Sequence, residues 1–121
     1  MNQAAKTYGK VANKISNPRE LEANLLLDAA CRLQMVKDAW DDNSGNLGPA
    51  LNYNRKLWTF FISAVTNNDN PLPSEIRQNI ANIGLFVCKQ TLATLADPKP
   101  QNLGSLININ RELAAGLLTR A

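Results

Sequence analysis

The stretch of sequence that decides the fold covers residues 17–40 and reads NPRELEANLLLDAACRLQMVKDAW. Asn17, Pro18 and Glu20 are typical of a helix start: Asn caps, Pro fits the first helical position, and Glu completes a capping box. Apolar residues then recur along one helical face: Leu21, Leu25, Ala29, Leu33, Val36 and Trp40. Four more widen that face: Leu26, Leu27, Ala30 and Cys31. We therefore predict a central helix from Pro18 to about Trp40.

Three further helices are predicted downstream, joined by short connectors. The apolar pattern places them at about residues 47–67, at about 73–95 and at about 103–119. Residues 41–46 have the composition of a loop, and the Asp97-Pro98-Lys99-Pro100 connector cannot continue a helix. Pro73 is expected at the first position of its helix. No stretch shows the alternation of a half-buried strand.

The helix at 73–95 carries two neighbouring apolar rows. The first row contains Ile76, Ile80, Ile83, Val87 and Leu95. The second contains Ala81, Leu85, Cys88 and Leu92.

The N-terminal segment is expected to add a fifth, amphipathic helix over about residues 3–15. Its apolar stripe holds Ala4, Tyr8, Val11 and Ile15, and its basic stripe holds Lys6, Lys10 and Lys14. An isolated helix of this length is marginally stable in water, so it must dock on its own domain or on a partner. Together the patterns predict an all-α, single-domain bundle of about five helices over residues 1–121, with residues 1–16 as a movable element.

Composition bounds the function. The 121 residues suit one domain, and 45% apolar with 19% charged residues is ordinary for a globular protein. A net charge of +3 is far from the dense basic patch of a nucleic-acid binder. The two cysteines, Cys31 and Cys88, form no C-x-x-C unit and are expected to be buried free thiols. With no signal peptide or membrane span in the pattern, we expect a cytoplasmic protein that does not contact membranes.

The sequence offers little for catalysis. It contains no histidine, which removes the commonest general base and metal ligand. It also lacks a glycine-rich phosphate loop. We therefore expect no enzyme activity, no cofactor, no metal and no small-molecule substrate. Direct RNA binding through Lys6, Lys10 and Lys14 is disfavoured, because the aromatics that stack on bases are missing there, but it stays open.

Polar residues within the helix at 47–67 raise a second question. Asn54 and Arg55 are costly to bury, so Arg55 is expected at a rim where Trp58 is partly exposed for binding. The alternative, equally favoured, places Trp58 in the core with the Arg55 stem over it. The segment N52-Y-N-R-K-L also resembles N108-I-N-R-E-L in the last helix. We interpret that echo as coincidence or as similar helix-surface chemistry.

Four segments in this order resemble the FlaF family of alphaproteobacterial flagellar regulators, from about Tyr8 to Leu117. They are Pro18–Glu22, Asn54–Phe60, Leu72–Arg77 and Ile109–Leu113. The chain departs from the family pattern at Thr7, where Ala is usual, and at Asn17, which separates Ser16 from Pro18.

The resemblance implies a positive role in flagellin synthesis and export, opposed in many species by the regulator FlbT. It implies a secretion chaperone that covers an amphipathic terminal helix of flagellin by helix-in-groove binding. We place the groove between the helices at 47–67 and 73–95, with Trp58 and Phe61 as anchors. Asn54, Arg55 and Arg77 would set the register, and the first helix, with Tyr8, would act as a lid. An RNA-linked regulator of flagellin messenger, directly or through FlbT, and a structural adaptor are the alternatives.

Overall fold

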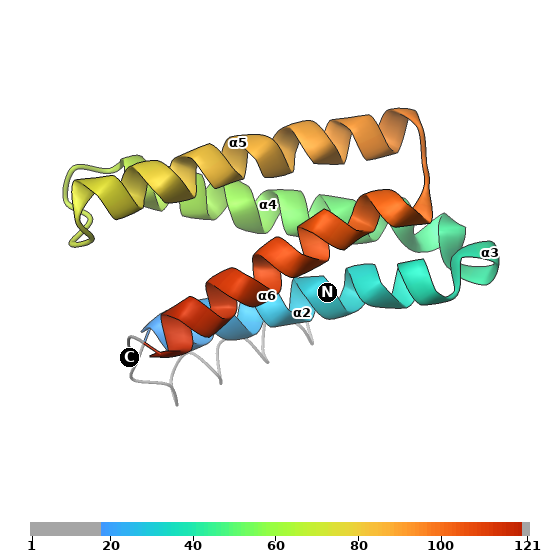
Figure 1. Cartoon of the computed structure of the whole chain (residues 1–121), viewed down its shortest axis with the longest axis horizontal. Helices are drawn as coiled ribbons and strands as arrows, with labels where there is room; N and C mark the ends of the chain where they lie inside the picture. Colours follow the sequence, from blue (N-terminus) through green and yellow to red (C-terminus); the bar gives the residue numbers. More distant parts are fainter. Residues whose placement is uncertain (1–17, 120–121) are drawn as a thin grey trace, which may run out of the picture.

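A computed structural model describes residues 18–119, and these residues form helices and no strand (Figure 1). The elements are α2 (Pro18–Asp38), α3 (Trp40–Asn43), the 3₁₀ turn η1 (Ser44–Asn46), α4 (Leu47–Thr66), α5 (Ser74–Ala96), the 3₁₀ turn η2 (Pro100–Asn102) and α6 (Leu103–Thr119). The predicted all-helical bundle is confirmed. The helix expected over 3–15 lies outside the described residues.

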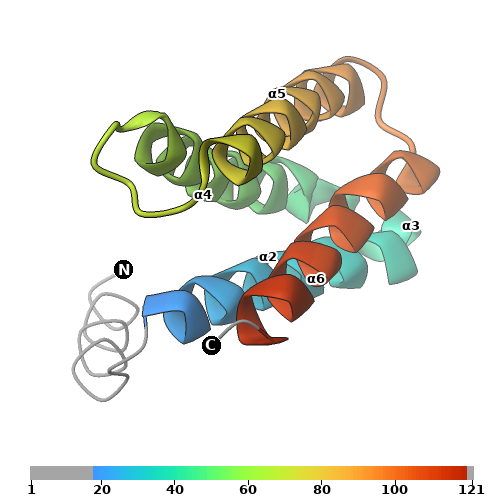
Figure 2. The same cartoon turned by 60° about the vertical axis from the view of Figure 1, so that its left-hand side comes forward.

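The four long helices are arranged as two pairs. Helix α2 packs mainly on α6, and α4 packs mainly on α5, while α2 and α4 join the two pairs. Helix α5 makes little contact with α6, so it depends almost entirely on α4 for its place (Figures 1 and 2). One whole side of α5 is therefore left without a neighbouring helix in the described part of the chain.

Two helix boundaries differ from the prediction. The stretch expected as a loop at 41–46 is instead the short helix α3 followed by η1. Helix α2 ends at Asp38, so Trp40 begins α3 instead of closing the central helix. Pro73 is the N-cap of α5, because its ψ of 145° is extended while its carbonyl already accepts the Arg77 N–H at 3.0 Å. The predicted Asn17 cap lies outside the described residues.

The core is built from one face each of α2, α4 and α6, with a narrow strip of α5. The largest fully buried apolar side chains are Trp58, Leu26, Leu33, Leu51, Leu103, Leu106, Ile107 and Val87. The expectation that both cysteines are buried is wrong for Cys31, which is exposed. Cys31 follows Ala30, the residue at the edge of the buried face of α2. Cys88 is half-buried. None of the described helices has the length and apolar character needed to cross a bilayer.

Candidate partner-binding surfaces

Trp58 lies entirely inside the core. Its exposed fraction is 0%, and its indole Nε1–H donates to Oδ1 of Asn110 at 2.9 Å. Its ring also meets Phe61 edge to face, with centroids 5.8 Å apart. The interpretation of Trp58 as a partly exposed anchor is therefore wrong. The core placement of Trp58 in the alternative is confirmed, because the indole N–H finds its acceptor on α6 and needs no water.

The echoed N-x-N-R-x-L segments meet at this point. The Asn110 amide donates to Oδ1 of Asn54 at 2.7 Å and to the Leu26 carbonyl at 3.3 Å, and both asparagines are fully buried. The central Asn of one segment thus pairs with the central Asn of the other. The surface interpretation of the echo is wrong, since these residues join α2, α4 and α6 inside the bundle.

The other predicted site residues are spread over the structure. Arg55 is exposed, and its guanidinium donates to Asn52 Oδ1 at 2.7 Å. Arg77 is half-buried and donates to the Asn67 carbonyl at 3.3 Å, while its Nε is buried without a partner among the described residues. Phe61 is buried and lines a pocket. Tyr8 lies outside the described residues.

Helix α5 presents an apolar row to solvent. Leu85, Leu92 and Leu95 are 57%, 65% and 49% exposed. With Ala81 and Cys88 they follow a spacing of four, three, four and three residues, which is the seam by which one helix packs along another. The second row expected from the sequence, extended by Leu95, is thus a stripe with three exposed leucines and two half-buried members, Ala81 and Cys88.

The residues that α5 turns inward explain why this stripe is left outside. They include Gly84, Thr91 and Thr94, which are small or polar. The two threonine hydroxyls donate to carbonyls of their own helix, Val87 and Gln90, each at 2.7 Å. Because these buried residues are small or have hydroxyls already bonded within α5, the helix can approach α4 closely. The larger apolar side chains of α5 then remain on the side of α5 that faces solvent.

The close approach is measurable at Gly84. A Cβ added there would lie 2.5 Å from Ile62 Cγ1 and 2.6 Å from Ile62 Cδ1, on α4. Ile62 belongs to a row on α4 with the same spacing, formed with Arg55, Thr59 and Thr66. Thr66 and Ala81, one from each row, line a common hollow of about 270 Å³ together with Arg77. We call these two adjoining rows the α4–α5 surface.

The charge on α4 and α5 has one dominant sign. The two helices carry four basic side chains and a single carboxylate, Glu75; the basic ones are Arg55, Lys56, Arg77 and Lys89. Arg55, Lys56 and Lys89 are exposed. The α4–α5 surface therefore joins a leucine-rich row on α5 to a more polar row on α4 that includes Arg55, and the exposed charges on these two helices are mostly basic.

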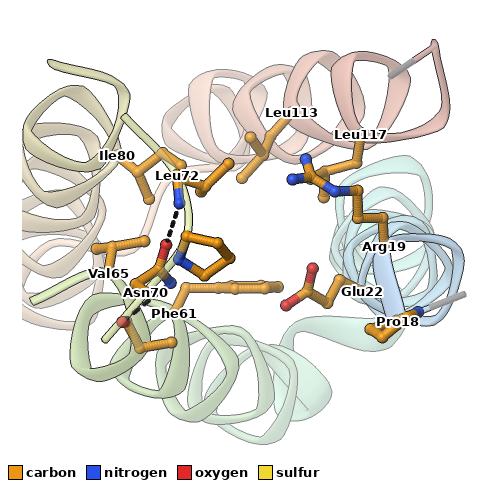
Figure 3. A pocket seen from close by; sticks show the side chains of 12 residues that line it. Pro18, Arg19, Glu22, Phe61, Val65, Asn70, Leu72, Ile80, Leu113 and Leu117 are labelled. Atoms are coloured by element: carbon orange, nitrogen blue, oxygen red, sulfur yellow. Dashed lines mark hydrogen bonds between the residues drawn. The ribbon is translucent and has the colours of Figure 1, made fainter. Parts of the chain in front are cut away.

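A pocket of about 310 Å³ opens at one end of the bundle, where α2 begins and α6 ends (Figure 3). Its lining is mostly apolar and comes from α2, α4, α5, α6 and the loop before α5: Pro18, Arg19, Glu22, Phe61, Ala64, Val65, Asn70, Pro71, Leu72, Ile80, Leu113 and Leu117. We call it the end pocket. Asn70 shapes one wall, because its side chain donates to the Ala64 carbonyl at 3.1 Å and accepts the Leu72 N–H at 2.9 Å (Figure 3).

One titratable group stands out at the end pocket. Burial raises the pKa of the Glu22 carboxyl above its usual 4.5, and the nearby Arg19 guanidinium offsets part of that rise. Among residues 18–119, no group of three or more acidic, Cys or His side chains is placed to hold a metal ion. The end pocket offers mainly apolar contact, with one carboxylate and one guanidinium at its wall.

Sequence reasoning found the stripe on α5 but not its exposure, and it missed the end pocket. The pocket takes its walls from segments as distant as Pro18 and Leu117, so no local pattern reveals it. For the stripe, one signal was present: Gly84, Thr91 and Thr94 repeat at helical spacing and mark a close, narrow contact face.

The described residues form a helical bundle with an exposed apolar stripe on one helix, and such stripes are typical of interaction surfaces. Comparison with known families is more specific: the family described as "Flagellar protein FlaF" matches residues 4–117. The chain belongs to the FlaF family and is a flagellar protein. No match was found among curated proteins or among solved structures.

Proposed function

We propose that this protein is a cytoplasmic secretion chaperone that binds flagellin and promotes its synthesis and export. The observation that carries the proposal is the exposed apolar stripe of α5, which runs beside the Arg55–Thr66 row of α4. A stripe this large on a small protein is a place for a partner, because exposed leucines at helix-packing spacing gain by leaving water.

The dimensions suit a single helix. Leu95 lies 14 positions after Ala81, which corresponds to about 21 Å along the α5 axis at 1.5 Å per residue. A partner helix of about four turns covers that length with apolar residues at the i, i+3, i+4 and i+7 positions. An amphipathic terminal helix of flagellin has apolar residues at these positions. They must be kept from water before export, and the stripe of α5 would cover them.

The roles of the predicted site residues change accordingly. Leu85 and Leu92 take the anchoring role first given to Trp58, which instead supports α4 from inside. Arg55 and Arg77 keep the role of polar contacts at the margin, because both lie on the helices that frame the stripe. An effect on flagellin synthesis would follow from the amount of bound flagellin, sensed directly or through FlbT.

The test is calorimetry of the purified protein with monomeric flagellin, at low and high salt. Wild-type binding with a negative heat-capacity change and weak salt dependence is expected for an apolar interface. We expect Leu92→Asp, on the stripe, to weaken binding at least about tenfold, the equivalent of about 1.4 kcal/mol. Met35→Asp is the matched control, since Met35 is 61% exposed on α2, away from the stripe.

Each outcome decides between explanations. Wild-type binding that Leu92→Asp does not weaken would move the flagellin site away from the α4–α5 surface. No binding by the wild-type protein would contradict the chaperone proposal itself. The partners to test next would then be FlbT, for an adaptor, and flagellin messenger, whose binding would show a steep salt dependence.

A further inference from the structure

The described chain begins at the wall of the end pocket. Pro18, the first residue of α2, lines that pocket, and so do Arg19 and Glu22 on the next turn. Proline disfavours helical backbone in the residue before it, so the chain is expected to leave the α2 axis here. The segment before Pro18 is thus attached at the edge of an open apolar hollow.

We propose that residues 4–15 of this chain dock in the end pocket, with Val11 and Ile15 against its apolar walls. The proposal is independent of flagellin binding, because none of the residues in the two rows of the α4–α5 surface lines the end pocket; Val65 alone lines both that pocket and the hollow beside Thr66. It places the N-terminal segment as an intramolecular fifth element of the bundle, held at the end where α2 and α6 meet.

Reach and effective concentration favour this occupant over any other. Two residues lie between Ile15 and Pro18, and an extended chain covers at most about 10 Å over these three residue steps. The apolar stripe of the segment therefore starts within reach of the pocket in every copy of the protein. A tethered segment competes at an effective concentration near the millimolar range, which a free partner rarely reaches.

Shape and hydrophobicity also agree. The pocket walls include Phe61, Val65, Leu72, Leu113 and Leu117, whose side chains surround the hollow in Figure 3. Apolar walls without contacts on one side lose dispersion attraction, and an apolar side chain placed there restores it. The stripe of Tyr8, Val11 and Ile15 supplies such side chains at helical spacing.

Charge gives a second, independent reason. Glu20 and Glu22 lie on the first turn and a half of α2, and Glu22 is half-buried at the pocket wall. Burial raises the pKa of Glu22, and the Arg19 guanidinium lowers it in part. Lys10 and Lys14, from the basic stripe of the docking segment, would bring positive charge to this end of α2. The family match also starts at residue 4, so the segment lies within the matched part of the chain.

Trypsin tests the proposal on the full chain, because it cleaves after Lys10 and Lys14. The cleavage rates at these two bonds, followed by mass spectrometry, are compared with those in a free peptide of residues 1–17. A docked segment is cleaved only when it opens, so we expect cleavage at least about tenfold slower in the chain than in the peptide. Equal rates would overturn the proposal.

Two matched pairs of variants locate the contact. Val11→Asp should raise the cleavage rate of the chain to that of the free peptide. Asn13→Asp, on the opposite side of the predicted helix, should not. Each variant is compared with a free peptide of its own sequence. Leu117→Asp, in the pocket wall, should also restore it, whereas its exposed neighbour in Leu118→Asp should not. Circular dichroism checks that the Leu117 variant still folds.

The variants separate the remaining outcomes. If Val11→Asp frees the segment and a folded Leu117→Asp does not, the segment docks elsewhere and the end-pocket assignment is wrong. If neither variant changes a slow cleavage rate, the apolar stripe is not the contact, and the proposal is also wrong. The assay contains no flagellin, so its result stands whether or not the chaperone proposal survives.

Discussion

Asn110 illustrates, at the scale of a single residue, how a buried polar side chain specifies this bundle. Its amide accepts from Trp58 Nε1 and donates to Asn54 Oδ1 and to the Leu26 carbonyl, so it bonds to α2 and α4 from α6. A buried polar group without partners is costly, so only the arrangement that brings these four groups together is favourable. Asn54 is the less complete member, because its Nδ2 has no partner among the described residues.

Replacing Asn110 with Ala should therefore destabilise the fold by about 2–4 kcal/mol, since it leaves the Trp58 indole N–H without its acceptor and opens a cavity. Asn54→Ala should cost clearly less, because it removes one hydrogen bond from a side chain that is already half unpaired. Urea denaturation followed by circular dichroism measures both. Equal costs would show that the network has no centre at Asn110.

At the scale of the element, α5 is a helix with two opposed requirements. Toward α4 it presents Gly84, Thr91 and Thr94, which permit close packing. Away from the core it presents Leu85, Leu92 and Leu95, which a stable monomer has no reason to expose in a row. The narrow contact that holds α5 on α4 is the physical cause of the free stripe that we propose for flagellin.

Gly84→Ala tests that close contact. The added Cβ would lie 2.5 Å from Ile62 Cγ1, so either the Ile62 side chain or the two helices must shift, and overpacking of this kind costs about 1–3 kcal/mol. The substitution recovers about 1 kcal/mol of helix propensity, so the net change expected is destabilising and modest. Gly116→Ala on α6 is the control: no atom lies within 4 Å of its added Cβ, and stabilisation is expected. Thermal unfolding compares the two, and a stabilised Gly84 variant would refute the tight contact.

At the scale of the whole molecule, the two helix pairs meet closely through α2 and α4 and diverge between α5 and α6. The end pocket lies where all four long helices and the 67–73 loop come together (Figure 3). Glu22 lies at this junction, so the pKa of its carboxyl depends on residues from several helices. The protonation of this one side chain therefore contributes to the pH dependence of the stability of the whole fold.

Glu22 has a raised pKa in the folded protein, and the sign of its effect follows. Well below its ordinary value of 4.5 the carboxyl is protonated in both states and has no effect on the pH dependence. As the pH rises through 4.5, the unfolded chain releases the proton first, so this group lowers stability from there upward. At neutral pH the charged Glu22 is thus a destabilising group.

Glu22→Gln should accordingly stabilise the protein at about pH 7, by less than about 1 kcal/mol because solvent screens a half-exposed carboxylate. At about pH 3 the variant and the wild type should be equally stable, since both side chains are then neutral. Urea denaturation at the two pH values measures this difference. Glu20→Gln is the control, because it removes the same charge from an exposed residue nearby. An identical gain in stability there would show that the effect comes from the net charge and not from the burial of Glu22.

By itself the sequence determined the elements: four long helices, the proline-containing connector before α6 and the exclusion of strands, because periodicity and proline act over a few residues. It also contained the second row of α5, Ala81, Leu85, Cys88 and Leu92, as a pattern. The last turn of the central helix was misjudged, because α2 ends at Asp38 and a short helix follows.

Only the tertiary structure decided which apolar face is covered and which is free. Trp58 and Leu92 look equally apolar along the chain, yet one is fully buried and the other is 65% exposed. The difference depends on where Ile62 meets Gly84 and on Asn110 bonding to Asn54, contacts between residues more than twenty positions apart. Burial is a property of neighbouring elements, and a helical period gives the direction of a side chain but not what lies opposite it.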